Sequence, residues 1–214
     1  MAKRRIYFRF VAYLFVILGF SFAVAGSYED FFEAIARDDA AVVSALVRRG
    51  FDPNSRDPQG QTGLFLALRS GSLKAAEALW EVPSLELDAL NATDESALMI
   101  AALKGQLDWC RRLLERGAAP NKTGWSPLHY AATGPDPAVV RLLLERGATV
   151  DAESPNRSTP LMMASRYGPE ESVDLLLARG ADPRRANDQK LKAADFARLG
   201  GRSTLAARLD GLAR

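Results

Sequence analysis

The residues best suited to catalysis in this sequence are its single histidine, His129, and its single cysteine, Cys110. An imidazole placed beside a thiol or a hydroxyl can act as a general base in nucleophilic catalysis. Cys110, however, follows Trp109 in an apolar helical stretch, where a cysteine behaves as a small hydrophobic residue. No Ser/His/Asp arrangement can be assembled without His129. The sequence therefore predicts a non-catalytic protein, and an enzyme with a site hidden in a groove is the alternative from another class.

The same scarcity argues against metal and cofactor sites. Multi-cysteine and histidine-rich metal sites need more ligands than one cysteine and one histidine can supply. The chain has 26 Asp and Glu residues, but nothing in their spacing marks a pair. It also contains no glycine-rich phosphate loop. We therefore predict neither a metal nor a cofactor.

The first 25 residues have the pattern of an export signal. Four basic residues within positions 3–9 precede an uncharged apolar stretch over residues 10–25, which ends in Ala23-Val24-Ala25. This order is typical of a secretory signal peptide, here with cleavage before Gly26. An uncleaved anchor is the alternative, because the stretch approaches the length that spans a bilayer. In both cases the positive-inside rule predicts that residues 26–214 are translocated to the far side of the membrane.

Removal of the signal changes the charge of the protein. The 214 residues contain 28 Lys and Arg against 26 Asp and Glu, a formal net charge of +2. Four of these cations lie within residues 1–25, so residues 26–214 carry 24 basic and 26 acidic residues, a charge of −2. Nucleic-acid binding requires clustered cations that neutralise phosphates. We therefore expect no nucleic-acid partner.

Residues 26–214 contain two internal repeats. The triplet Arg-Gly-Ala recurs at Arg116, Arg146 and Arg179, with spacings of 30 and 33 residues. Tetrapeptides that begin with Ser or Thr recur at Thr62, Ser96, Ser126 and Thr159, and the third of them reads Ser-Pro-Leu-His. Periods near 33 residues indicate stacked supersecondary units.

These repeats resemble the ankyrin repeat over residues 28–214, and residues 124–151 are the most similar copy. The resemblance implies an all-α solenoid of about six helix-turn-helix units joined by β-hairpin-like loops, with residues 1–25 as the signal and 26–214 as the repeat domain. In this family a histidine at the position of His129 makes structural hydrogen bonds between loops. The positions that match the repeat signature are Gly50, Thr62, Ser96, Gly117, Ser126, Pro127, Leu128, His129, Gly147, Thr159, Pro160 and Gly180.

Local physical chemistry supports the same helices. Ser126 and Thr159 are good N-cap residues, and Pro127 and Pro160 fit the first helical position, where a missing N–H costs nothing. Gly147 can end a helix in the left-handed conformation. We further predict a helix over residues 28–40, two short helices separated at Gly200-Gly201, and a solvent-facing end that includes Arg202. The loop between the third and fourth units should be three residues shorter than its neighbours.

The resemblance also implies where a partner protein would bind. Ankyrin stacks generally bind proteins through the concave surface made by hairpin tips and first helices. Trp125, Arg166 and Tyr167 are the leading candidates, because Trp, Tyr and Arg dominate interface hot spots. Packing of Trp125 across the short loop and of Tyr167 over the stack is the alternative interpretation. The remaining candidate contact residues are Gln61, Arg69, Glu95, Lys104, Lys122, Thr133 and Asn156.

Taken together, the sequence predicts an exported, monomeric ankyrin-repeat protein that binds a protein partner without catalysis. Export combined with a single cysteine favours a bacterial periplasm, where stray disulfides are a hazard. The protein would stabilise or inhibit an envelope protein. The alternative within this class is a scaffold that keeps residues 1–25 and is tethered to the inner membrane, facing the periplasm.

Overall fold

The computed structural model describes residues 26–214, so the predicted signal peptide at 1–25 lies outside the described residues. The chain divides into two compact units, of which the first ends at Leu85 and the second spans Glu86–Arg214. Within residues 26–214, no helix is both long enough and apolar enough to cross a membrane.

Both units consist of paired helices. In the first unit, the helix over residues 26–36 pairs with α2 (Ala40–Arg48), and α3 (Gly63–Ser70) pairs with α4 (Leu73–Trp80). The second unit contains four pairs, which are α5 (Ala97–Leu103) with α6 (Leu107–Glu115), α7 (Pro127–Thr133) with α8 (Pro137–Glu145), α9 (Pro160–Tyr167) with α10 (Glu170–Ala178), and α11 (Ala193–Leu199) with α12 (Ser203–Leu212). The six expected helix pairs are thus confirmed within residues 26–214, including the break at Gly200-Gly201.

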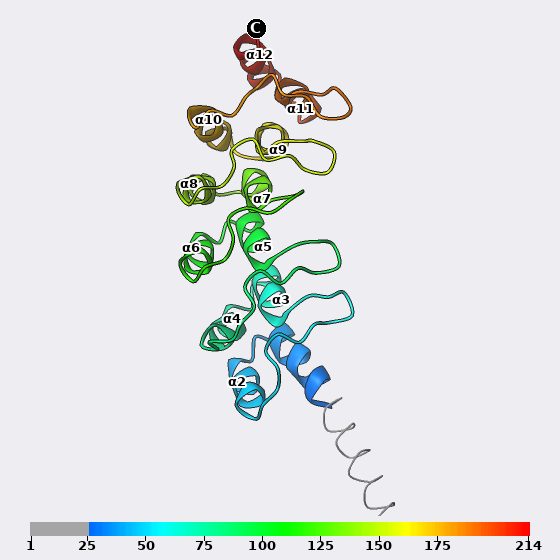
Figure 1. Ribbon diagram of the computed structural model, residues 1–214, viewed down its shortest axis with the longest axis vertical. Helices are drawn as coiled ribbons and strands as arrows, with labels where there is room; N and C mark the ends of the chain where they lie inside the picture. Colours follow the sequence, from blue (N-terminus) through cyan, green and yellow to red (C-terminus); the bar gives the residue numbers. More distant parts are fainter. Residues whose placement is uncertain (1–25) are drawn as a thin grey trace, which may run out of the picture. The chain divides into compact units, whose positions relative to one another are not determined.

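The helices of the second unit form two layers. Figure 1 shows α5, α7 and α9 side by side in one layer and α6, α8 and α10 in the other. The helices of each layer bury their apolar faces against neighbouring helices, because a single helix pair cannot cover both of its own faces. The fully buried leucines of the second unit are Leu98, Leu113, Leu128, Leu143, Leu161, Leu176 and Leu209.

The starts of the first helices follow the predicted capping chemistry. Thr62 accepts a hydrogen bond from the backbone N–H of Phe65 (3.3 Å), and Ser96 and Thr159 make the same bond in their repeats. Pro127 and Pro160 occupy the first helical positions after Ser126 and Thr159. The hydrogen bonds accepted by Thr62, Ser96 and Thr159 satisfy backbone N–H groups that have no partner inside the helix.

The ends of the second helices were also predicted correctly. Gly147 follows α8 with φ +83°, a left-handed conformation that is strained for residues with a Cβ atom. The equivalent residues Gly50, Gly117 and Gly180 have φ values of +93°, +102° and +87°.

A second set of glycines, which directly follow the first helices, allows these helices to approach each other. Gly134, Gly168 and Gly200 have ordinary negative φ values, so their conformation does not require glycine. A Cβ atom on Gly168 would lie 2.1 Å from the carbonyl oxygen of Ala132 in the preceding repeat, and one on Gly134 or Gly200 would lie 2.7 Å from a backbone oxygen. These glycines therefore determine how closely successive repeats pack.

The loops that precede the first helices are hairpin-like, as expected. In the first unit Arg56 and Thr62 form an isolated antiparallel bridge. At each full-length loop tip a backbone N–H donates to the carbonyl four residues later, at 2.9 to 3.0 Å, and these bonds join Asp57 to Gln61, Asn91 to Glu95, Ser154 to Ser158, and Asn187 to Leu191. The side chain of the first residue also accepts from backbone N–H groups of its own tip, which holds the turn.

One loop of the second unit is shorter than its neighbours. Residues 116–126 connect α6 to α7, whereas residues 146–159 and 179–192 make the following two connections, each three residues longer. In Figure 1 the loop before α7 extends less far than the loops before α5 and α9. The predicted shortening is therefore confirmed.

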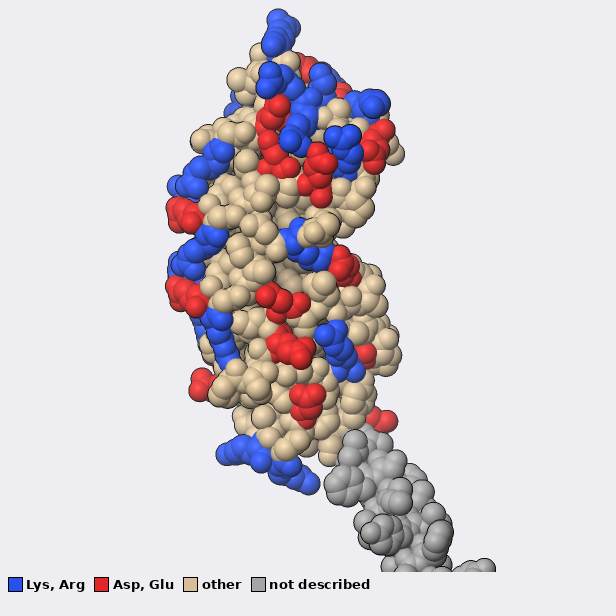
Figure 2. All heavy atoms as spheres, viewed as in Figure 1, with Lys and Arg blue, Asp and Glu red and all other residues tan. Residues whose placement is uncertain are grey.

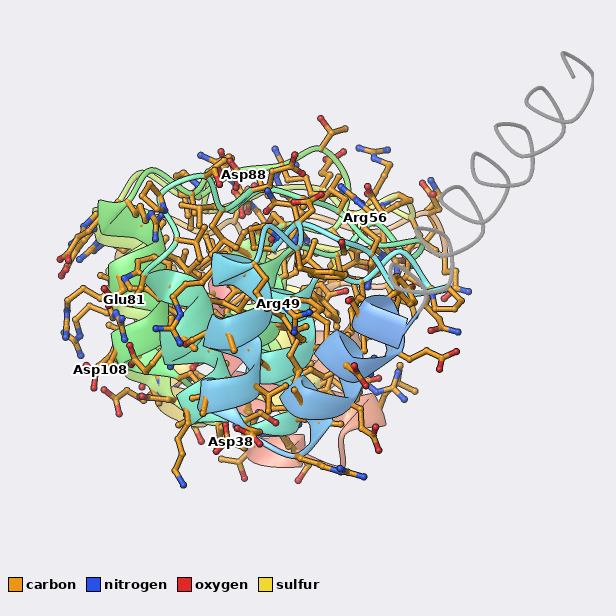
Figure 3. All side chains as sticks on the ribbon, turned by 90° about the horizontal axis from the view of Figure 1, so that it is seen from below. Asp38, Arg49, Arg56, Glu81, Asp88 and Asp108 are labelled. Carbon is orange, nitrogen blue, oxygen red and sulfur yellow. The ribbon has the colours of Figure 1, made fainter. Side chains whose placement is uncertain are left out.

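Two local predictions were wrong. The expected helix over 28–40 ends at residue 36, because Asp38 takes a left-handed φ of +56° and Asp39 caps α2 instead. Asp38 accepts a hydrogen bond from the backbone N–H of Ala75 (2.9 Å), and Figure 3 shows it on the opposite edge of the first unit from Arg56. Aspartate favours such caps and turns over helix interiors.

Arg202 also differs from its predicted position on the solvent-facing end. Its guanidinium group donates to the carbonyl oxygens of Ala164, Ser165 and Gly168, at 3.0, 3.2 and 2.8 Å. These carbonyls lie in and just after the last turn of α9, and that of Ala164 also accepts from the backbone N–H of Gly168 (3.0 Å). Arg202 therefore links the last repeat to the one before it.

Candidate protein-binding site

His129 lies at the centre of the second unit and connects two repeats. The backbone N–H of Ser126 donates to its Nδ1 atom (3.2 Å), so the ring proton is on Nε2 and is donated to the carbonyl of Ser158 (2.9 Å). Burial lowers the pKa of His129 to about 4 and outweighs the carbonyl hydrogen bonds that raise it. The structural role implied by the repeat signature is confirmed.

Cys110 is fully buried in α6, as predicted. Burial raises the pKa of its thiol to about 12, and the charge of Asp136 adds to this effect. Because the thiolate is the nucleophile and the metal ligand, a cysteine in this environment is inert. Among residues 26–214, no group of three potential metal-ligating His, Cys, Asp or Glu residues comes together.

The second unit contains an open, mostly apolar pocket with a volume of about 220 Å³. We call it the groove pocket. It lies between the first helices and the short loop, and it is lined by Leu103 of α5, Trp125, three residues of α7 (His129, Tyr130 and Thr133) and Met163 of α9.

Trp125 is positioned by the short loop that precedes α7. Its indole is half-buried and packs edge-on against the His129 ring, with 5.2 Å between the ring centroids. The two interpretations of Trp125 are thus compatible, because it packs against its own repeat and also forms a wall of the groove pocket.

Two candidate contact residues, the acidic Glu95 and the basic Lys122, already bind other side chains of this protein. Glu95 accepts a hydrogen bond from the hydroxyl of Tyr130 (2.8 Å), and burial together with this bond raises the pKa of Tyr130. Lys122 forms an ion pair with Asp94 and is largely buried, with 16% of its side chain exposed. Glu95 thereby holds Tyr130, which lines the pocket.

At the end of α9, Tyr167 is exposed and Arg166 is half-buried. The Arg166 guanidinium lies over the Tyr167 ring, 4.9 Å from its centroid, and Tyr167 is 53% exposed. Met163 lies three and four residues earlier on the same helix, so these side chains continue the face that lines the pocket. Lys104, which follows Leu103 at the end of α5, is exposed on the other side of the pocket.

The remaining predicted contact residues lie elsewhere. Gln61 is buried in the first unit, at 9% exposure, so it is not available to a partner. Arg69, also in the first unit, is exposed, and its guanidinium lies near the Phe65 ring. Asn156 is exposed, but its side-chain oxygen accepts from Ser154 (2.6 Å) within its own loop.

Besides His129, which the repeat signature marks as structural, three residues that line the groove pocket are not among the predicted contacts. The sequence patterns place Leu103, Tyr130 and Met163 in helices without marking them as contact residues. Tyr130 and Met163 both stand four residues after the N-cap of a first helix, at Ser126 and Thr159. This register, compared between repeats, is the signal that could have identified them.

The outer layer, in contrast, carries charges that neutralise each other. Along α6, α8 and α10, Glu115 pairs with Arg146 (3.5 Å) and Glu145 with Arg179 (3.7 Å). Figure 2 shows the resulting alternation of acidic and basic side chains along this edge. The loop that contains Arg185 is similarly interleaved with acids, so the arginines there are already paired.

Comparison with known proteins agrees with the fold. The family described as Ankyrin repeats (3 copies) matches residues 31–123 and 118–187. Neurogenic locus notch homolog protein 4 from Homo sapiens is 36% identical over 149 residues, which are 61% of this chain and 7% of that protein. The B-cell lymphoma 3 protein homolog from Mus musculus is 34% identical over 148 residues, which are 66% of this chain and 33% of that protein. The chain thus matches only a minor part of these relatives' length.

Two solved structures have the same fold. One chain of a complex between a predatory endopeptidase from Bdellovibrio bacteriovorus and an immunity protein superposes with a TM-score of 0.70 at 24% identity, covering 84% of this chain and 97% of that chain. The ankyrin-repeat domain of Bcl-3 gives a TM-score of 0.64 at 29% identity, covering 83% and 81%.

The paired helices and hairpin-like loops define an all-helical repeat protein. The chain belongs to the ankyrin-repeat family.

Proposed function

We propose that this protein is exported to the bacterial periplasm and acts there as a monomeric, non-catalytic module that binds an envelope protein. The observation that carries the proposal is the groove pocket, where Trp125, Tyr130 and Met163 line an open apolar site on the face that ankyrin repeats use. Stacked repeats hold these side chains in place, so little conformational entropy is lost on binding.

The consequence of binding would be stabilisation or inhibition of the partner. The solved complex of an endopeptidase with an immunity protein supports inhibition as one outcome, since a chain of this fold occurs in it. At 24% identity only the fold is shared. The complex therefore serves only as an example of a protein complex that contains this fold.

Site-specific crosslinking in the native envelope tests the groove. A photo-crosslinking residue replaces Thr133, which is half-buried in the groove pocket, and in a matched control it replaces Arg141, which is exposed on α8. We expect one defined protein adduct from position 133 and none from position 141. Adducts from position 141 alone, or the same adducts from both positions, would contradict binding through the groove.

The fate of residues 1–25 is tested separately. The intact mass of the protein recovered from the envelope should correspond to a chain that begins at Gly26. A mass that includes residues 1–25 would instead support the membrane-tethered scaffold, which binds in the same way but stays at the inner membrane.

A further inference from the structure

We propose that the groove pocket receives one apolar side chain from an extended segment of the partner, and that this segment carries acidic residues about three positions before and after that side chain. The inference rests on the proposed function and specifies the chemistry of its partner. Three observations carry it: the size and chemistry of the pocket, the charges beside it, and the spacing of the helices that carry those charges.

The groove pocket has the volume and the lining for a single apolar side chain. An apolar cavity of about 150 Å³ accommodates benzene, so about 220 Å³ suits a Phe, Leu or Met side chain. The polar groups in its wall already donate within the protein: His129 to Ser158 (2.9 Å), Tyr130 to Glu95 (2.8 Å) and the Thr133 hydroxyl to the carbonyl of His129 (2.9 Å). A polar occupant would therefore lose its hydration with little compensation.

The charges left open beside the pocket are positive. Lys104 and Arg166 stand at the ends of α5 and α9, and neither has a carboxylate partner among residues 26–214. The neighbouring acids are engaged: Glu95 accepts from Tyr130, Asp94 is paired with Lys122, and Asp136 caps α8 by accepting from the N–H of Ala138 (2.9 Å).

The helix spacing predicts where the acidic residues of the partner lie. Lys104 directly follows α5 and Arg166 lies in the last turn of α9, and α7 lies between these two helices (Figure 1). Packed helices are about 8–10 Å apart, so the two cations are separated by about 16–20 Å. An extended chain advances about 3.3 Å per residue, so about five to six residues span that distance. With the apolar side chain over α7, each carboxylate falls about three residues away.

Charge complementarity of this kind guides association and selects partners, while the buried apolar side chain supplies most of the affinity. The outer layer offers no equivalent site, because its arginines are paired with Glu115, Glu145 and Glu171.

A peptide selection with defined follow-up variants tests the proposal. The exported protein is used to select from a random nine-residue peptide library, and selected peptides should be enriched in a central apolar residue with Glu or Asp about three positions to each side. For a selected peptide, replacement of the apolar residue by Ala should weaken binding at least about tenfold. Replacement of both acids by Lys should have a similar effect.

Charge reversal in the groove provides the decisive comparison. The double variant Lys104→Glu/Arg166→Glu should lose the acidic peptide at least about tenfold and gain the Lys-substituted peptide. The matched control Arg141→Glu/Arg179→Glu makes the same charge change on the outer layer and should alter both affinities by less than about twofold. Circular dichroism of both double variants verifies the fold.

Three results would overturn the inference: no enriched peptide, enriched peptides without the acidic positions, or affinities that the groove reversal leaves unchanged. Each can occur while the photo-crosslinker at position 133 still captures a partner, and in that case the proposed function stands without this partner chemistry. If position 133 captures nothing, the proposed function fails as well.

Discussion

At the scale of the residue, His129 shows how a group with catalytic potential becomes a structural one. Its Nδ1 atom accepts from Ser126 and its Nε2 atom donates to Ser158, so both nitrogens are occupied within the protein. A general base needs a free lone pair within reach of substrate. His129 lacks one, although the ring also lines the groove pocket.

The buried neutral imidazole makes stability depend on pH. The pKa of His129 is lowered from 6.5 to about 4 in the folded protein, so between these values the unfolded chain binds more protons. Its contribution to the free energy of unfolding is therefore complete above about pH 6.5 and is lost as pH falls toward 4. Between these pH values the free energy of unfolding falls by up to about 1.4 kcal/mol for each pH unit. Urea titrations of the protein at pH 7, 6 and 5 measure this loss of stability.

The variant His129→Gln is the control for this prediction, because it removes the only imidazole in the chain. We expect it to be less stable at pH 7 and to lose most of the slope between pH 6.5 and 5. Equal slopes in the two proteins would show that another group is responsible.

At the scale of the element, the first helices pack closely because glycine follows them. The carbonyl of Ala132 occupies the space where a Cβ atom on Gly168 would lie, at 2.1 Å. Backbone cannot rotate away as a flexible side chain can, so α7 and α9 would have to separate.

Substitution of Gly168 by Ala should therefore destabilise the protein strongly, by about 2–4 kcal/mol, as overpacking in a core does. Gly211 in α12 is the matched control, because a methyl group at that position would meet nothing within 4 Å. There, Ala should be neutral or stabilise by up to about 1 kcal/mol, since it favours the helix. Chemical denaturation measures both variants, and a loss of less than about 1 kcal/mol for Gly168→Ala would contradict the close approach.

At the scale of the whole molecule, the chain consists of two compact units that meet in sequence between Leu85 and Glu86. The boundary falls in residues 81–95, where the second repeat lacks its terminal glycine and Pro83 follows α4. In repeat proteins stability is the sum of repeat and interface contributions, so units of different size need not open together.

Native-state hydrogen exchange should resolve the two units. We expect a lower opening free energy for the first unit, which has two helix pairs, than for the second, which has four. Leu46→Ala, which leaves a cavity beneath α2, should lower protection throughout the first unit and leave α9 and α11 unchanged. A uniform loss of protection over both units would contradict independent opening.

Several features could be predicted from short stretches of sequence because their causes are local. Thr62, Ser96 and Thr159 cap helices through bonds that span three residues, and Gly147 ends a helix through its own φ angle. The predicted helix over residues 28–40 was too long because two consecutive aspartates, Asp38 and Asp39, form a turn and a helix cap there. Asp38 is held there by Ala75, which lies 37 residues away.

The sequence by itself therefore determined the family, the six helix pairs and the short loop before α7, because repeated local patterns specify each unit. Only the tertiary structure decided which side chains form the groove pocket, since Leu103, Tyr130 and Met163 come from three repeats and meet only when α5, α7 and α9 pack together. The tertiary structure also decided which charged side chains have a partner within the protein. Glu95 and Lys122 are engaged by residues 28 to 35 positions away, whereas Lys104 and Arg166 have no carboxylate partner among residues 26–214.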